Sequence, residues 1–193
     1  MEEQKLNLDS LREQLDVVDD DILELLKKRA NLVLDVKKAK NQNNINVYSP
    51  AREKKIIKRI ISKAKDGNFP LASLESIFIN IISASRSLIG DLQIAYIGQE
   101  GLDAGVKQFG ETVNFIAQNT VEDAFYSVEN TKAHFAVLPA RFETYQRLAS
   151  SSLSIIAQRD NIHLIVGPLP SASTGSDKTS AGFVLEDLSL IHI

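Results

Sequence analysis

Apolar residues recur every three or four positions through the first half of the chain, the spacing of one face of an α-helix. The first stripe begins near Ser10, where Glu13 completes a capping-box pattern that predicts a helix start. Neither proline nor glycine interrupts the pattern before the polar segment 41–44, so one helix of roughly 32 residues, on the order of 50 Å long, is predicted. Such a helix is too long to be covered by its own ninety-residue domain, which favours pairing with a second copy of the chain.

Two shorter helices are predicted before residue 90. Ser49 followed by Pro50 is a paired start signal for the second helix, expected over 50–65. The third helix is expected over about 72–88, and Gly90 is expected to end it as a C′ residue. The first half of the chain is therefore predicted to be helical.

Beyond residue 90 the pattern changes to short apolar runs separated by turn residues, and eight of the nine glycines lie at or beyond Gly90. Helical segments separate most of these runs, and Thr120 with Asp123 resembles a helix start. Strand–helix alternation predicts a parallel sheet with right-handed crossovers. Strands are expected at 93–98, 113–117, 133–139, 152–158, 162–167 and 179–186. The chain thus divides into a helical domain, 1–90, and an α/β domain, 91–193.

Four polar residues interrupt the apolar stripes of the three predicted helices: Arg29, Lys40, Glu53 and Ser85. Any one of them alone is more often structural, because a long aliphatic stem can cover apolar surface while its charge reaches water. Packing the stripes together would instead bring all four into one interior pocket, where an unpaired charge costs several kcal/mol and an anionic ligand would relieve that cost. Such a set suits a reaction that needs conformational restraint and electrostatic stabilisation without covalent chemistry.

The composition of the chain argues against several other classes of function. The formal net charge of -3 gives no reason to expect nucleic acid or an anionic membrane as a partner. The absence of cysteine excludes disulfides and thiolate chemistry and suits a reducing cytoplasm. The three histidines are far apart and are interpreted as ordinary strand residues, so no metal or other cofactor is expected. No apolar run reaches membrane-spanning length, and the acidic start is unlike a signal peptide.

Four segments of the first ninety residues form a recognisable set: LREQLDVVDDDILELLKKR, KKAK, VYSPARE and the helix ending IISASRSL. Through them, this half of the chain resembles the all-helical chorismate mutase family, which converts chorismate to prephenate. The resemblance implies an intertwined three-helix homodimer with two active sites. In each site, Arg29 and Arg12 of the partner subunit would hold the two carboxylates of the substrate.

The same resemblance implies a role for each remaining site residue. Lys40 would donate to the ether oxygen that gains negative charge, and Glu53 would hydrogen-bond the substrate hydroxyl, near which Ser49 would also lie. Arg52 would support the site electrostatically, and Ser85 would contact a carboxylate.

One position departs from that family. Four residues after Ser85 the family has a glutamine or glutamate that also donates to the ether oxygen, whereas this chain has Ile89. Losing one preorganised donor to a developing oxyanion typically costs ~2.7 to 4 kcal/mol. We therefore expect a mutase that is weakened more in turnover than in substrate binding.

The second half resembles one lobe of prephenate dehydratase, through IAYIGQEG, TVEDAFYSVEN and AVLP. The stretch LIVGPLPSASTGSDKTSAGFVLE resembles the exit from that catalytic domain into its regulatory ACT domain. The polar motif after the third strand is replaced by Ala140-Arg141-Phe142, and the threonine-arginine-phenylalanine motif by Asn161-Ile162-His163. We therefore expect neither dehydratase activity nor an intact phenylalanine-binding ACT domain.

The sequence thus predicts a cytoplasmic chorismate mutase of aromatic amino-acid biosynthesis, fused to a reduced, non-catalytic dehydratase-like α/β domain. The fold class is α + α/β. One alternative is a non-catalytic chorismate-binding or regulatory protein, which Ile89 favours. Another is a structural helical dimerisation module, which leaves the four polar residues on apolar stripes unexplained.

Overall fold

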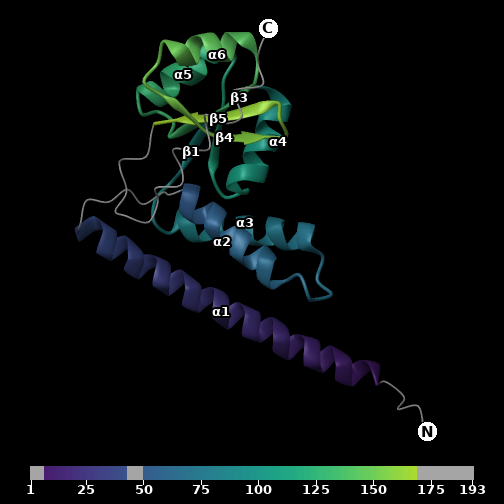
Figure 1. Cartoon of the computed structure of the whole chain (residues 1–193). Coiled ribbons are helices and arrows are strands. Elements are labelled where there is room, and N and C mark those ends of the chain that lie inside the picture. Colours follow the sequence, from purple (N-terminus) through teal and green to yellow (C-terminus); the bar gives the residue numbers. More distant parts are fainter. Residues whose placement is uncertain (1–6, 43–49, 169–193) are drawn as a thin grey trace.

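The computed structural model describes residues 7–42 and 50–168. The first described segment is one helix, α1, Leu8–Gln42, which is 35 residues long (Figure 1). Asn7 caps this helix, because its side-chain oxygen accepts a hydrogen bond from the backbone N–H of Asp9 at 3.1 Å. The expected start at Ser10 was wrong: Ser10 lies inside the first turns, where its carbonyl accepts a hydrogen bond from the Gln14 side chain. The expected long, uninterrupted helix is confirmed.

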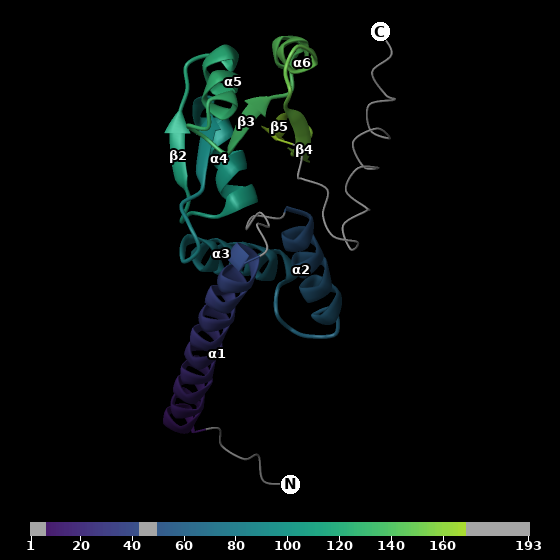
Figure 2. The ribbon, with the colours of Figure 1, turned by 90° about the vertical axis from the view of Figure 1, so that its left-hand side faces the viewer.

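The predicted apolar stripe of α1 is largely uncovered in the single chain. Ile22, Leu25, Leu32 and Val36 are between 48% and 65% exposed. The helix contacts α3, Leu71–Ser87, where Arg29 and Ala30 are half-buried. Toward its N-terminus α1 projects away from the rest of the molecule (Figure 2).

The other two helices pack against each other. Helix α2, Pro50–Lys63, begins at the predicted proline, whereas the predicted cap Ser49 lies outside the described residues. Helix α3 ends at Ser87, and the Arg86 carbonyl accepts hydrogen bonds from the N–H groups of the residues three and four positions later. Leu88 is the C-cap of α3, so the C′ position is residue 89, and the expectation of Gly90 as the C′ residue was wrong by one position.

The α/β part is a five-stranded sheet in the order β2-β1-β3-β5-β4. Its elements are β1 Gln93–Tyr96, α4 Gly98–Phe109, β2 Asn114–Ala117, α5 Val121–Glu129, β3 Phe135–Pro139, α6 Phe142–Ala149, β4 Ser154–Arg159 and β5 His163–Gly167. Strand β1 pairs in parallel with β2 and β3, but β5 pairs antiparallel with both β3 and β4. The sheet is therefore mixed, and the fully parallel sheet predicted from the alternation was wrong.

The reason for the antiparallel pairing is a tight turn between β4 and β5. Asp160 and Asn161 both have positive φ, 50° and 55°, and Arg159 pairs directly with His163. Asparagine and aspartate tolerate this left-handed geometry better than most residues, which lets two adjacent strands form a hairpin. The sixth expected strand, 179–186, lies outside the described residues.

Side chains alternate between two cores, one on each face of the sheet. Ala95, Ala136 and Leu138 face α5 and α6, where Phe125 is fully buried. Their neighbours along the same strands face α4 and pack around Phe109, which is also fully buried. The result is three layers, with α4 on one face and α5 with α6 on the other.

The N-cap predicted at Thr120 is confirmed, because its hydroxyl accepts a hydrogen bond from the Asp123 N–H at 3.1 Å.

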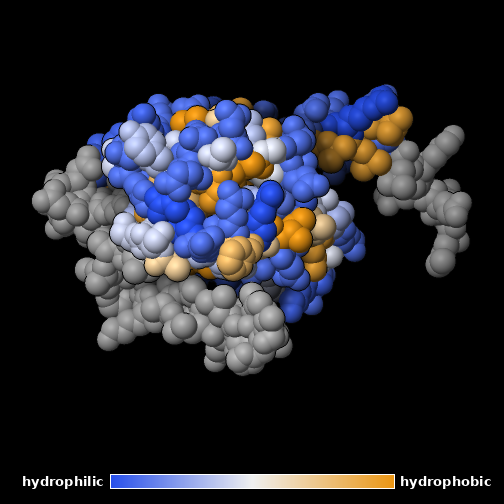
Figure 3. All heavy atoms as spheres, turned by 90° about the horizontal axis from the view of Figure 1, so that it is seen from above, coloured by the Kyte–Doolittle hydropathy of each residue, from blue (hydrophilic) through white to orange (hydrophobic). Residues whose placement is uncertain are grey.

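Seen from above, the face of the α/β part is mostly hydrophilic, with several apolar groups among the polar ones (Figure 3). The same view shows the N-terminal end of α1 projecting beyond the body, with apolar side chains grouped along one side. Among the described residues, no helix combines the length and the apolar character needed to cross a bilayer.

Candidate functional site

Arg29 of α1 and Ser85 of α3 meet where these two helices cross. The Arg29 guanidinium donates one hydrogen bond to the Ser85 hydroxyl and another to the Ile81 carbonyl at 3.2 Å. Ser85 itself donates to the same carbonyl at 2.7 Å. Two of the four polar residues predicted to share a pocket are thus in direct contact.

Glu53 of α2 contacts α3 at Arg86, the residue that follows Ser85. It forms a two-pronged ion pair with Arg86, whose Nε lies 3.1 Å from Oε1 and whose Nη2 lies 3.1 Å from Oε2. The Glu53 side chain is 21% exposed and that of Arg86 is 8% exposed. Three successive helices therefore contribute charged or polar groups to one cluster: Arg29, Glu53, Ser85 and Arg86.

The electrostatics of the cluster are set by burial and by two cations. Burial raises the pKa of Glu53, while the nearby charges of Arg86 and Arg29 lower it without cancelling the effect of burial. Burial likewise lowers the pKa of Arg29, and the charge of Glu53 opposes that change. Arg29 and Glu53 therefore influence each other although no direct hydrogen bond joins them here.

An open groove lies beside this cluster between α1 and α3, with a volume of ≈ 360 Å³. Its walls are mainly apolar, and Ser85 supplies a hydroxyl beside Arg29. The lining residues are Leu26, Ala30, Asn80, Ile81, Ala84, Ser85 and Leu88. A concave, mostly apolar space with a few oriented polar groups is typical of small-molecule sites.

Arg12, by contrast, is not part of this cluster in the single chain. Arg12 is exposed and pairs with Asp9 at 3.2 Å near the start of α1, as expected for a residue that cannot reach Arg29 of its own chain. Arg52 is exposed at the start of α2. Ser49 and the side chain of Lys40 lie outside the described part of the chain.

Ile89 lies two residues beyond the end of α3, in a turn, and is half-buried. Its backbone N–H donates to the Arg86 carbonyl at 2.8 Å. The residue of this segment that lines the groove is Leu88. The predicted end of the helix near residue 88 agrees to within one residue with the structure, so Ile89 follows α3 and is not part of it.

Sequence reasoning did not identify Arg86, although a signal for it exists. Ile79 and Ile82 form a second apolar stripe along α3, and Arg86 is the next residue on that face. A cation at that place needs an anion or a carbonyl as its partner when the helix is buried.

Within the described residues, no group of three or more histidine, cysteine, aspartate or glutamate side chains is placed to hold a metal ion.

Several known proteins are similar to the helical half of the chain. Residues 11–89 match the family model described as chorismate mutase type II. A chorismate mutase from Methanocaldococcus jannaschii is 39% identical over 61 residues, which is 32% of this chain and 62% of that protein. A solved chorismate mutase from Thermus thermophilus shares 28% identity over 40% of this chain and 96% of its own, with a TM-score of 0.39.

Longer relatives extend the similarity into the α/β half. The bifunctional chorismate mutase/prephenate dehydratase of Aquifex aeolicus is 31% identical over 159 residues, 79% of this chain and 44% of that protein. The protein of the same name from Neisseria gonorrhoeae is 32% identical over 136 residues, 69% of this chain and 37% of its own length. This chain therefore spans less than half the length of these two relatives.

Proposed function

Because residues 11–89 form a domain of the chorismate mutase type II family, we propose that this chain converts chorismate to prephenate. The reaction is an intramolecular rearrangement. The ether C–O bond to the ring breaks while a C–C bond forms between the side chain and the ring, and no atom, proton or electron leaves the molecule. The task of the protein is to hold the substrate in a compact conformation and to stabilise the charge that gathers on the ether oxygen.

The observation that carries this proposal is the meeting of Arg29 and Ser85 beside the groove. Arg29 is held by two acceptors on α3, so its guanidinium is oriented before any ligand arrives. An oriented guanidinium can take a carboxylate through its remaining N–H groups. In this proposal Arg29 binds one substrate carboxylate, Ser85 orients the Arg29 guanidinium, and Glu53 accepts a hydrogen bond from the substrate hydroxyl.

The remaining roles rest on the family pattern. Lys40 is assigned as donor to the ether oxygen, with Arg52 as electrostatic support and Ser49 near the substrate hydroxyl. Arg12 of the partner subunit is assigned to the second carboxylate. That last assignment needs a homodimer, and the uncovered apolar stripe of α1 supports one.

We assign residues 91–193 to a reduced dehydratase-like domain without dehydratase activity. The long alignments with the bifunctional relatives support the likeness. The replaced motifs support the loss of activity, because Arg141 stands as the N-cap of α6 and Phe142 is 79% exposed. In the second replaced motif, Asn161 adopts a left-handed turn and His163 begins β5.

The direct test measures chorismate disappearance and prephenate formation with purified protein. We expect turnover that saturates with chorismate and is lost in Lys40→Ala. Turnover that Lys40→Ala leaves unchanged would point to a contaminating enzyme. Supplied prephenate should give no phenylpyruvate, and enzyme-dependent phenylpyruvate formation would contradict the assignment of the second domain.

A second candidate function is chorismate binding without catalysis. Ile89 favours it, because this position supplies a donor in the family pattern and here offers only an apolar side chain. Calorimetry separates the two functions. Saturable chorismate binding with no prephenate formed over hours would support the binding protein and contradict the mutase.

A further inference from the structure

We propose that Arg86 is a positioning residue, which fixes the orientation of the Glu53 carboxylate and links it to the turn between α4 and β2. The inference rests on the proposed function only in its kinetic consequence, because Glu53 is assigned to the substrate hydroxyl. The link itself is a property of the protein without substrate. Through it, the α/β half would act on the site in the helical half.

The first support is the geometry of the ion pair. Arg86 meets both oxygens of Glu53 at 3.1 Å through two different guanidinium nitrogens. Two parallel hydrogen bonds fix the plane of a carboxylate as well as its position, which a single bond does not do. Because both side chains are largely buried, water competes little for either partner.

The second support is the other end of the same guanidinium. Nη1 of Arg86 lies 3.5 Å from the Phe109 carbonyl, at the last residue of α4. The carbonyls at the C-terminus of a helix carry partial negative charge and attract a cation. Arg86 is therefore held between a carboxylate of the helical half and a helix end of the α/β half.

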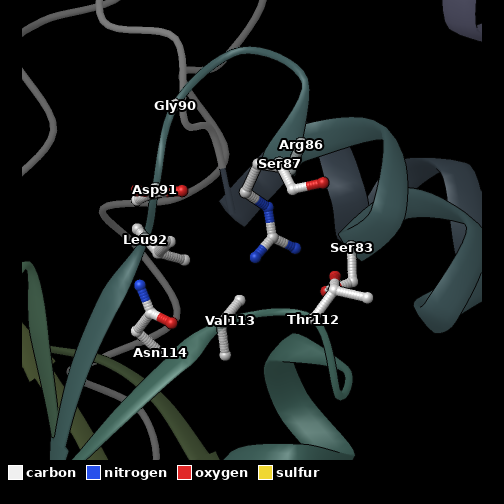
Figure 4. A pocket seen from close by; sticks show the side chains of 9 residues that line it. All are labelled: Ser83, Arg86, Ser87, Gly90, Asp91, Leu92, Thr112, Val113 and Asn114. Carbon is white, nitrogen blue, oxygen red and sulfur yellow. Dashed lines mark hydrogen bonds between the residues drawn. The ribbon is translucent and has the colours of Figure 1, made fainter.

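The surroundings leave Arg86 little freedom to leave this arrangement. Figure 4 shows its guanidinium pointing from α3 toward the segment that contains Thr112 and Val113. The cavity there has a volume of only ≈ 10 Å³, roughly the space of one water molecule. An alternative rotamer of Arg86 would thus have to displace its neighbours.

The turn itself is fastened to α3 by two further hydrogen bonds. The hydroxyls of Ser83 and Thr112 lie 2.6 Å apart, and the Glu111 N–H donates to the Asn80 side-chain oxygen at 3.2 Å. Gly110 brings the backbone so close that an added Cβ would lie 2.5 Å from Cβ of Ser83. A displacement of this turn is therefore passed to α3 and to Arg86.

A kinetic cycle tests whether Arg86 acts through Glu53. The four proteins are the wild type, Arg86→Gln, Glu53→Gln and the double variant, each assayed for kcat and KM with chorismate. We expect Arg86→Gln to lower kcat by about 10²-fold, a loss that a misplacement of about 1 Å can cause, with a smaller change in KM. In the Glu53→Gln background the same change should cost less than about 3-fold in kcat, because the two residues act as a unit.

The opposing interpretation is that Arg86 only stabilises the fold. An equal loss of kcat in both backgrounds would overturn the proposal. Arg86→Lys is the conservative control, since it keeps the charge but lacks the two-pronged geometry. The kcat of Arg86→Lys should fall between those of the wild type and Arg86→Gln. A kcat equal to that of the wild type would contradict the proposal, because the charge alone would then position Glu53.

A titration of the Glu53 carboxyl by ¹³C NMR keeps the inference testable without turnover. The signal is assigned by its absence in Glu53→Gln. Arg86 of α3 and Arg29 of α1 both lower the Glu53 pKa, so Arg86→Gln should raise it. If the wild type does not turn over chorismate, the proposed function is wrong. The titration still tests whether Arg86 acts on Glu53.

The link to the turn has its own variant. Thr112→Val removes the hydroxyl that contacts Ser83 and keeps the shape of the side chain. It should shift the Glu53 carboxyl signal, whereas Ser150→Ala after α6 should not. A Glu53 signal that responds to Arg86→Gln but not to Thr112→Val would overturn the coupling to the α/β half.

Discussion

Arg29 and Ser85, 56 residues apart in sequence, form a hydrogen bond that determines what each can offer a ligand. The Ser85 hydroxyl accepts from Arg29 and donates its single proton to the Ile81 carbonyl, 2.7 Å away. Ser85 therefore orients Arg29 and has no proton left for a carboxylate unless it rotates. Arg29 retains further N–H groups and is the stronger candidate for direct contact with a carboxylate.

Replacing Arg29 should weaken substrate binding strongly. A hydrogen bond to a charged group contributes about 1.5 to 3 kcal/mol, so Arg29→Ala should raise the Kd for chorismate roughly 10- to 100-fold. Lys27→Ala is the matched control, because Lys27 is exposed on the same helix and pairs only with Glu24 in the described contacts. Calorimetric titration checks both variants, and equal affinities for the two would contradict the role assigned to Arg29.

The uncovered stripe of α1 predicts an assembly that fails when the stripe is charged. Leu25 is 65% exposed in the single chain, so Leu25→Lys would place an unpaired cation in a dimer interface at a cost of several kcal/mol. We expect sedimentation to show a dimer for the wild type at micromolar concentration and a monomer for this variant. Asp20→Asn changes the charge by the same amount on nearly the opposite side of the helix and should remain dimeric. A monomeric wild type would remove Arg12 from the site.

Glu53 should make the stability of the fold depend on pH. Burial holds its pKa above the ordinary 4.5, so the folded chain binds this proton more tightly than the unfolded chain does. Its contribution to the free energy of unfolding is then full below about pH 4.5 and is lost as pH rises through the folded-state pKa. Urea unfolding from about pH 4 to about pH 7 should therefore show the wild type losing stability relative to Glu53→Gln. The opposite slope would mean that the two arginines outweigh burial.

Gly110 is predicted to be essential for the contact between α3 and the α/β half. Its φ is +81°, and an added Cβ would collide with Ser83, so Gly110→Ala should destabilise the chain by about 1 to 3 kcal/mol. Gly90→Ala is the matched control, because φ there is not positive and no atom lies within 4 Å of the added Cβ. Thermal unfolding of the two variants should differ clearly, and similar melting temperatures would contradict the tight packing at Gly110.

The sequence predicted the elements better than their ends and pairings. The helical period alone identified α1, but the Ser10–Glu13 pattern competed with Asn7, and the structure uses Asn7 as the cap. Strand–helix alternation identified β1 to β3, but it could not show that β4 and β5 pair as a hairpin. The relevant signal was local, in the turn residues Asp160 and Asn161.

The candidate site was also predicted only in part from the sequence. Arg29, Glu53 and Ser85 were predicted because each interrupts an apolar stripe, and the structure brings them together. The apolar-stripe argument did not predict Arg86, because this residue lies on the face of α3 that is turned toward α2 and α4. Only the packing of the two halves of the chain shows what covers that face. Periodicity identifies a buried face without saying what covers it.

Ile89 gives the sharpest test of the assigned chemistry. If this mutase lacks one donor to the ether oxygen, its defect should lie in the transition state more than in binding, because the carboxylate contacts exist before the bond breaks. Ile89→Gln should then raise kcat by ~10² or more with a smaller change in KM. Lys40→Ala should abolish activity in both backgrounds, since Lys40 is the other donor assigned to that oxygen.

The position of Ile89 also defines the contrary outcome. It lies half-buried in the turn after α3, so a glutamine there stays partly in water and should change the free energy of unfolding by less than about 1 kcal/mol. A gain in kcat would mean that α3 continues through this turn when the site is assembled, because only a helical position 89 lies one turn beyond Ser85 on the same face. An unchanged kcat in a stable, dimeric variant would instead mean that the turn persists. The donor assignment would then be wrong, and chorismate binding without catalysis would become the better account of this chain.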